Sequence, residues 1–272
     1  MLFGLMAVLT RITTRQGFSA AQIAVVRFAV GLGLSGLWFA ARPGTFAPVQ
    51  HRLLITRGAL GGLAAFLYFV ALSRIPAGEA TLLNNTFPIW ATLLASITLH
   101  ERPTVHIAVG LGLASIGVSL VLRDNAAHIA FGWGELAAIA SALLAGGAVT
   151  AIRALRATDN APTIFFAFCL GGLLVSWPFA LGSWPAEPTA WAIALIGVGG
   201  TSFGAQLLMT QSYGELTVPE AAIWQQLTPV MTYLWAIGLL GEQLALVGAV
   251  GVLLGISGVV YASVTARARR RE

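Results

Sequence analysis

The chain contains few charged residues, no lysine and a single cysteine, and each of these scarcities excludes a class of protein. Only 9% of the 272 residues are charged, whereas 57% are hydrophobic and the mean hydropathy is +0.84. A water-soluble surface cannot be built from this composition, so lipid must surround most of the exterior. Cys169 cannot form an internal disulfide because it is the only cysteine, and we interpret it as a small packing residue.

The absence of lysine also limits the chemistry that the chain could perform. A phosphate-binding loop needs a lysine after its glycines, and all 15 basic residues here are arginines. The four histidines are dispersed over loops and helix ends, and no HExxH or GxSxG motif occurs. We therefore expect no enzyme, no cofactor and no metal. The arginines stand singly in predicted loops apart from a C-terminal cluster, which disfavours nucleic-acid binding.

Apolar runs punctuated by proline, glycine and charge predict ten membrane-spanning helices. Crossing the hydrocarbon core takes about 20 apolar residues per helix. An all-α membrane protein follows, because a sheet edge in lipid would leave backbone groups unpaired. The predicted helices are residues 1–14, 22–40, 53–72, 79–99, 104–122, 134–152, 163–181, 190–211, 219–240 and 244–264.

The second half of the sequence overlays the first at a constant offset of 141 residues without a gap. The matched pairs are Glu79 with Glu220, Pro88 with Pro229, and Glu101 with Glu242. Shared helix composition would produce matching leucines and alanines, but not these pairs. We therefore divide the chain into a first repeat at residues 1–130, a second repeat at 131–266 and a basic tail at 267–272.

Five helices per repeat is an odd number, so the two copies must enter the membrane from opposite sides and form an inverted-topology pair. With the N-terminus inside, most arginines face the cytoplasm. The positive-inside rule thus predicts a multi-pass protein of the plasma (bacterial inner) membrane with both termini cytoplasmic. We interpret the tail as a topology anchor, with a lipid-binding patch as the alternative. The arginines assigned to the cytoplasm are Arg42, Arg52, Arg57, Arg102, Arg153, Arg156, Arg267, Arg269, Arg270 and Arg271.

The repeat also indicates that the first predicted helix is short at its start. The equivalent helix of the second repeat opens near Gly134, and the offset of 141 places that start at −7, before Met1. About 14 residues rise only about 21 Å, less than the roughly 30 Å of the hydrocarbon core. We therefore expect the natural start, and cavity residues of this helix, to lie upstream of Met1.

The fourth and fifth helices of each predicted repeat carry a family resemblance. The chain resembles an EamA-type permease of the drug/metabolite transporter superfamily over both halves. The resemblance implies a ten-helix fold with a central cavity lined by helices 1, 3, 4, 6, 8 and 9, helices 5 and 10 packed together, and export or exchange of small metabolites. The residues that carry it are Glu79, Pro88, Glu101, Gly110 and Gly117 with their copies, and Arg27 and Phe28 in AVVRFAVGLGL.

Two pairs of amide side chains, each followed by a proline, are the strongest candidates for substrate binding. A proline within a helix frees the carbonyl four residues earlier, so side-chain amides here lie beside an unpaired backbone acceptor. Interrupted helices at matching positions of two repeats typically mark a transporter's binding site. The alternative is that the amides only join helices around two tolerated kinks. The candidates are Asn84, Asn85 and Pro88, and Gln225, Gln226 and Pro229.

Four other polar or aromatic residues lie in helices that the resemblance assigns to the cavity. Tyr68 and Gln206 offer hydrogen bonds, and Trp90 and Trp224 offer aromatic walls or cation–π faces. The alternative for the aromatic residues is a position facing lipid or the membrane interface.

Carboxylates are absent from the middle of every predicted span, which disfavours proton coupling and an obligate exporter of cationic drugs. Glu79 and Glu220 open their helices, where the positive helix N-terminus favours a carboxylate. We interpret Glu101 and Glu242, at the far ends of the same helices, as partners for backbone or arginine groups.

Two stripes of small residues predict where the repeats join. Spacings of four and three place each stripe on one helix face, where small side chains allow backbones to approach closely. We predict a packing seam between the repeats, with a dimer interface as the alternative. The stripes are Gly110, Ala114 and Gly117, and Gly251, Gly255 and Gly258.

These features together predict an alternating-access permease that moves a small polar or zwitterionic, amino-acid-like metabolite by export or exchange. We expect a small-molecule substrate and membrane lipid as its partners, and a monomer, with a dimer as the alternative. The competing interpretations are an exporter of amphipathic drugs or organic cations and, further from the pattern, a channel or an intramembrane enzyme.

Overall fold

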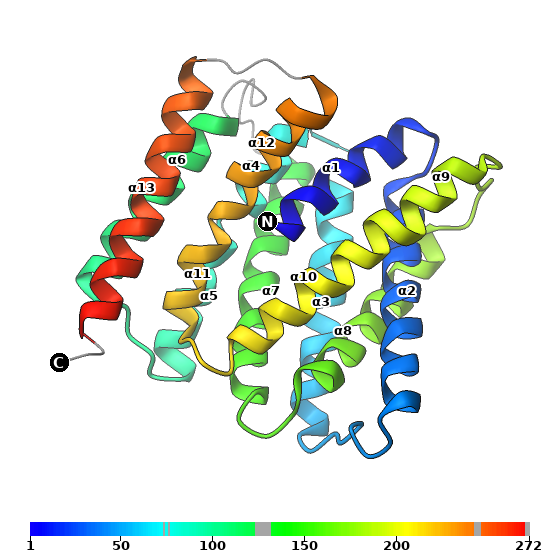
Figure 1. Cartoon of the computed structure of the whole chain (residues 1–272), viewed down its shortest axis with the longest axis horizontal. Coiled ribbons are helices and arrows are strands. Elements are labelled where there is room, and N and C mark those ends of the chain that lie inside the picture. Colours follow the sequence, from blue (N-terminus) through cyan, green and yellow to red (C-terminus); the bar gives the residue numbers. More distant parts are fainter. Residues whose placement is uncertain (73, 76, 123–131, 242–245, 270–272) are drawn as a thin grey trace.

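The computed structural model describes residues 1–72, 74–75, 77–122, 132–241 and 246–269, and its regular elements there are all helices (Figure 1). The first half contains α1 (Leu2–Arg15), α2 (Ala20–Ala41), α3 (His51–Leu72), α4 (Ala77–Asn84), α5 (Phe87–Thr98) and α6 (Val105–Leu122). The second half contains α7 (Trp133–Leu155), α8 (Ala161–Ser176), η2 (Trp177–Phe179), α9 (Pro188–Ala192), η3 (Ile193–Gly200), α10 (Thr201–Ser212), α11 (Val218–Gln225), α12 (Leu227–Leu240) and α13 (Leu246–Arg269).

Several of these helices are long and apolar enough to cross a membrane. Within the described residues, five segments of 19 to 25 residues reach a mean hydropathy of 1.6 or more over an 18-residue window. Because each of them pairs its own backbone groups, the chain is a multi-pass membrane protein. The five segments are Ala20–Ala41, Trp133–Leu155, Ala161–Phe179, Pro188–Ser212 and Leu246–Thr265.

Side-chain caps fix several helix starts. The Ser19 hydroxyl accepts a hydrogen bond from the Gln22 amide nitrogen, and the Gln22 side chain accepts one from the Ser19 nitrogen, forming a capping box ahead of α2. Asn160 caps α8 through the Thr163 nitrogen at 2.9 Å. These bonds satisfy backbone donors that would otherwise be unpaired at the ends of membrane helices.

Helix boundaries repeat at the 141-residue offset. α4 and α11 begin at Ala77 and Val218, and α6 and α13 begin 141 residues apart as well. The residues after the fourth and ninth predicted helices, His100 and Gly241, share a left-handed backbone with φ of 57° and 66°. The two halves therefore share these helix starts and this left-handed residue as well as matching residues.

The fourth predicted helix and its copy are each broken into two segments. The first is divided into α4 and α5 at residues 85–86, and the second into α11 and α12 at Gln226. Pro88 and Pro229 lie in the first turn of the segment after each break, and each lacks the N–H that in a continuous helix would bond to the carbonyl of Asn84 or Gln225. The predicted interruption of both helices is confirmed.

The two stripes of small residues pack against each other where α6 meets α13 (Figure 1). A Cβ added at Gly110 would lie 2.7 Å from the Gly258 carbonyl oxygen, and one at Gly117 would lie 2.7 Å from the Gly251 carbonyl oxygen. Only glycine permits this approach of two backbones. The predicted seam is thus confirmed as a contact within the chain.

Contacts along this seam come in symmetric pairs. At the 141-residue offset, Gly110 corresponds to Gly251 and Gly258 to Gly117. The contact of Gly110 with Gly258 is therefore equivalent by symmetry to the contact of Gly251 with Gly117. Residue numbers rise along α6 as they fall along α13, and the two equivalent helices therefore run antiparallel. A two-fold rotation that reverses the helix direction relates them.

One arginine predicted as a cytoplasmic loop charge lies inside the bundle. Arg57 follows the first residue of α3 by six positions, and its side chain is 3% exposed. The loop assignment was wrong because α3 turns this position toward α8, against which it packs, rather than toward solvent.

Candidate functional site

The two helix breaks bring one amide from each repeat into direct contact. Asn85 Nδ2 donates to Gln226 Oε1 at 2.8 Å, and Gln226 Nε2 donates to the Ser115 hydroxyl at 3.0 Å. Gln226 is 1% exposed and is among the largest fully buried side chains. Since burial of an amide is costly without partners, these bonds hold the two broken helices and α6 together.

Asn85 and Gln226 are also equivalent positions of the two repeats, because they differ by 141. A residue that touches its own equivalent lies on the axis that relates the repeats. Arg27 and Phe168 form a second such pair, with the guanidinium carbon 5.8 Å from the ring centroid. The helix breaks therefore lie at the local two-fold axis.

The neighbouring amide, Asn84, contacts α7. The Ser141 hydroxyl lies 2.9 Å from the Asn84 side-chain oxygen and 2.7 Å from the Ala64 carbonyl oxygen. A hydroxyl has one proton, so both contacts are satisfied at once when the Asn84 amide presents its NH₂ group to Ser141. Ser141 thus connects α3, α4 and α7 at the first break.

The other predicted site residues are divided among several environments. The Tyr68 hydroxyl lies 2.8 Å from the Thr81 hydroxyl, which connects α3 to α4. Gln206 is buried on α10, and Trp90 packs where α5 meets Gly146 of α7. Trp224 on α11 is 46% exposed, whereas Gln226, two residues later, is buried.

Sequence reasoning missed a second buried polar region, formed by α2, α3, α8 and α10. Arg27 Nε donates to the Ser202 hydroxyl at 2.7 Å, and the Arg57 guanidinium carbon lies 4.1 Å from the centroid of the Phe168 ring. The Tyr213 side chain, directly after α10, is fully buried. An ionisable residue several positions inside a span is the signal that could have identified this region.

Two of the described carboxylates, Glu101 and Glu220, take structural roles. Glu101 accepts from Arg153 Nε and from the Val218 nitrogen, each at 2.7 Å, and thereby joins the ends of α5 and α7 to the start of α11. Glu220 accepts from the Thr217 nitrogen at 2.9 Å and caps α11. Both predicted roles are confirmed, whereas Glu242 and the side chain of Glu79 lie outside the described residues.

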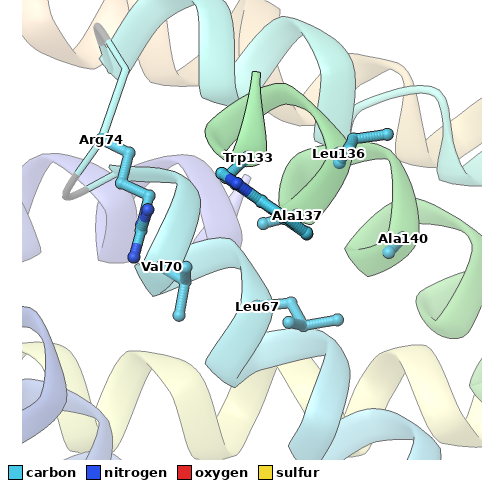
Figure 2. A pocket seen from close by; sticks show the side chains of 7 residues that line it. All are labelled: Leu67, Val70, Arg74, Trp133, Leu136, Ala137 and Ala140. Carbon is cyan, nitrogen blue, oxygen red and sulfur yellow. The ribbon is translucent and has the colours of Figure 1, made fainter. Parts of the chain in front are cut away.

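A surface groove of about 410 Å³ lies between the end of α3 and the start of α7 (Figure 2). Its walls are apolar apart from Arg74 and the indole nitrogen of Trp133, and none of the predicted site residues lines it. The groove and the predicted site are therefore separate. Its lining residues are Leu67, Val70, Arg74, Trp133, Leu136, Ala137 and Ala140.

Comparison with solved structures confirms the fold. A crystal structure described only as that of a protein matches 98% of this chain and 95% of its own chain, with a TM-score of 0.84. Its sequence identity is 20%, so the likeness concerns the fold alone.

Two kinds of curated relative are exporters. The pseudopaline exporter CntI of Pseudomonas aeruginosa is 25% identical over 79% of this chain and 76% of its own length. A probable terminal-alkyne amino-acid exporter of Streptantibioticus cattleyicolor is 27% identical over 97% of this chain and 94% of its own length.

The family comparison accounts for both repeats. The profile of the EamA-like transporter family matches residues 1–123 and again residues 132–264, which is nearly the whole chain. The resemblance drawn from the paired glutamates, prolines and glycines is confirmed, and the chain belongs to the EamA-like transporter family and is a membrane transporter, not an enzyme.

Proposed function

We propose that the chain exports or exchanges a small polar or zwitterionic, amino-acid-like metabolite across the plasma membrane by alternating access. The observation that carries the proposal is the meeting of two interrupted helices at the repeat axis, with Asn85 bonded to Gln226. Discontinuous helices at a repeat interface are where transporters of duplicated fold bind substrate. The relatives whose names specify cargo, pseudopaline and a terminal-alkyne amino acid, support this substrate class.

The proposed topology has ten membrane helices in two inverted repeats, with both termini cytoplasmic. The antiparallel course of α6 and α13 supports inversion, because these helices are equivalent members of the two repeats. Arginines at the ends of α2, α5 and α7, which this topology places on one side, support the orientation. They are Arg42, Arg102, Arg153 and Arg156.

The proposed binding site consists of the residues at and around the two breaks. In the substrate-bound state, the amides exchange their mutual hydrogen bonds for bonds to the metabolite, and the carbonyls freed ahead of the prolines accept from its ammonium group. The site residues in this proposal are Tyr68, Asn84, Asn85, Pro88, Trp90, Gln206, Trp224, Gln225, Gln226 and Pro229.

Counterflow in proteoliposomes tests the function. A thermal-shift screen of the purified chain against amino acids, nucleosides and amphipathic cations first selects solutes, and labelled forms of these are then offered to vesicles preloaded with the same solute. We expect saturable exchange of an amino acid. Exchange of organic cations alone would favour the drug-exporter interpretation, and flux that does not saturate would favour a channel.

Cysteine labelling tests the topology. His100 and Gly241 are exposed, equivalent positions that must face opposite sides of an inverted pair. In a Cys169→Ala background, His100→Cys and Gly241→Cys should react with a membrane-impermeant maleimide from opposite sides of intact cells, and both should react after solubilisation. Reaction of both from the same side would refute the inverted arrangement.

A further inference from the structure

The buried region between α2, α3, α8 and α10 holds a cation whose hydrogen bonding is incomplete. Arg57 is 3% exposed, and its Nε atom is buried with no hydrogen-bond partner among the described residues. At about 1.5 Å rise per residue, Arg57 lies about 9 Å into α3 from its first residue. A charged donor this deep in a membrane helix is costly unless a partner is supplied.

No carboxylate supplies that partner in the described part of the chain. The titratable groups that face Arg57 are Cys169, Arg27 and Tyr213, and none of them is a carboxylate. Of these, Arg27 is a second cation, and both guanidinium groups lie within 6 Å of the Phe168 ring centroid. An aromatic face offers a cation partial compensation, but it accepts no conventional hydrogen bond.

The Tyr213 hydroxyl is a second unsatisfied group in this region. Tyr213 is fully buried, and its hydroxyl makes no hydrogen bond by strict geometry in the described part of the chain, although the Gln225 side chain lies near enough to act on it. A guanidinium can only donate, and a phenol also has a proton to donate. A ligand that completes both groups must therefore bring acceptor oxygens and negative charge.

The fold itself does not need these charges. At the 141-residue offset, Arg57 corresponds to Val198 in η3 and Arg27 to Phe168 in α8, so the second repeat has apolar residues at both positions. Val198 is 1% exposed and packs in an apolar cluster. A charge that appears in only one copy of a duplicated scaffold, at a cost in desolvation, points to a function of that copy.

We infer that Arg57, together with the Tyr213 hydroxyl, binds the carboxylate of the transported metabolite; this rests on the transport function proposed above. The planar guanidinium matches the two oxygens of a carboxylate, and Tyr213 donates a further hydrogen bond. Arg27 adds a second positive charge and keeps its own bond to Ser202. The amides at the helix breaks then hold the remainder of the metabolite.

Matched acids and amides test this inference directly. The full-length protein in detergent is titrated with the L-amino acids and with their C-terminal amides, and thermal stabilisation is recorded for each pair. We expect acids to bind and their amides to bind at least about tenfold more weakly, because the amide lacks the charge that Arg57 recognises. Equal stabilisation by acid and amide, or stabilisation by no acid, would overturn the inference.

Three variants separate recognition from packing. Arg57→Met keeps the apolar stem and removes the charge, Arg57→Lys keeps the charge without the planar fork, and Arg52→Gln changes an exposed arginine of the same helix as a control. We expect Arg57→Met to weaken acid binding by roughly 10- to 100-fold while amide binding is unchanged, Arg57→Lys to be intermediate, and Arg52→Gln to match the wild type.

Stability supplies the second readout. Removal of an unpaired buried charge should leave the melting temperature of Arg57→Met at or above that of the wild type without ligand. If the variant melted clearly lower and kept its preference for acids over amides, Arg57 would be a structural partner of Phe168 and the inference would fail. Counterflow keeps the two proposals distinct: exchange of a solute without a carboxylate refutes this site alone, whereas no exchange of any solute refutes the transport function.

Discussion

The close packing of α6 against α13 can be tested by a glycine-to-alanine substitution, which adds a single methyl group. A Cβ at Gly117 would lie 2.7 Å from the Gly251 carbonyl oxygen and 2.8 Å from the Gly255 Cα, both backbone atoms that cannot rotate away. Ordinary contacts of carbon are about 3.5 Å, so Gly117→Ala must separate the helices by about 0.7 Å. A Cβ at Gly112, on the same helix, meets no atom within 4 Å.

The two alanine variants should therefore change stability in opposite directions. Overpacking of a close contact costs roughly 1–3 kcal/mol, and the loss falls on Gly117→Ala. Gly112→Ala gains roughly 0.5–1 kcal/mol, because alanine restricts the unfolded chain and favours the helix. Because both glycines lie inside α6 and share this gain, the difference between the variants in equilibrium unfolding in mixed micelles should equal the overpacking cost, about 1–3 kcal/mol.

Symmetry adds a check on this reasoning. A Cβ at Gly258 would lie 2.8 Å from the Gly110 carbonyl oxygen, and the equivalent contact of Gly117 with the Gly251 carbonyl oxygen is 2.7 Å. Gly258→Ala should thus cost about as much as Gly117→Ala. If either variant proved as stable as Gly112→Ala, the seam would not be close-packed and its assignment would be refuted.

Three further predictions concern the breaks and their flanks. Pro88→Ala and Pro229→Ala should impair counterflow without loss of expression, because each restores a helical hydrogen bond and straightens a helix. Wild-type rates in both variants would show that the kinks are tolerated and have no role in transport. A double-mutant cycle on Asn85→Ala and Gln226→Ala, measured by unfolding in micelles, should give a coupling free energy of about 0.6–1.7 kcal/mol. Strictly additive effects would contradict the hydrogen bond between the two side chains. Gly241→Ala should lower unfolding stability by roughly 1–2 kcal/mol, because its φ of 66° is strained for alanine while no side chain of the described residues crowds the position. Unchanged stability would contradict this.

The repeat explains why so much of the fold could be predicted from the sequence. Glycine and proline impose local geometry that no neighbour can override, so their recurrence at a fixed offset predicted both helix breaks and the seam. The helix boundaries were less accurate: the predicted span 163–181 ends as α8 at Ser176 and continues as η2. The helical span from Pro188 also includes the π-helical segment η3, where Gly199 approaches Val30 closely.

The candidate site was predicted only in part, because hydropathy does not say which way a side chain points. Asn85 and Gln226 were chosen separately as polar residues beside prolines, and their contact depends on where the repeat axis passes. Arg57 was counted as a loop charge because the sequence near the start of a span is the same whether the side chain faces water or packs against α8. Trp224 shows the converse, since an aromatic residue near the break is half exposed.

If the two repeats exchanged conformations, some contacts in this structure would be kept and others would break. The bond from Asn85 to Gln226 and the paired glycine contacts map onto themselves when the repeats are interchanged, so alternating access as proposed can proceed without breaking them. The bonds of Glu101 to Arg153 and to the Val218 nitrogen map onto different residues. At the 141-residue offset, Ile12 stands in place of Arg153 and cannot form the ion pair.

A cycle that interchanged the repeats would therefore keep the axis and must open the Glu101 contact. In such a cycle the axis contacts would act as the pivot, because they are compatible with both states. Glu101 is specific to one state, and it joins α5, α7 and α11 on the side that the arginine distribution assigns to the cytoplasm. We propose on this basis that the ion pair closes the cytoplasmic side. The repeats differ at its arginine, where Ile12 corresponds to Arg153, and at Arg57, which corresponds to Val198, and we propose that these two differences give a symmetric scaffold a direction and a cargo.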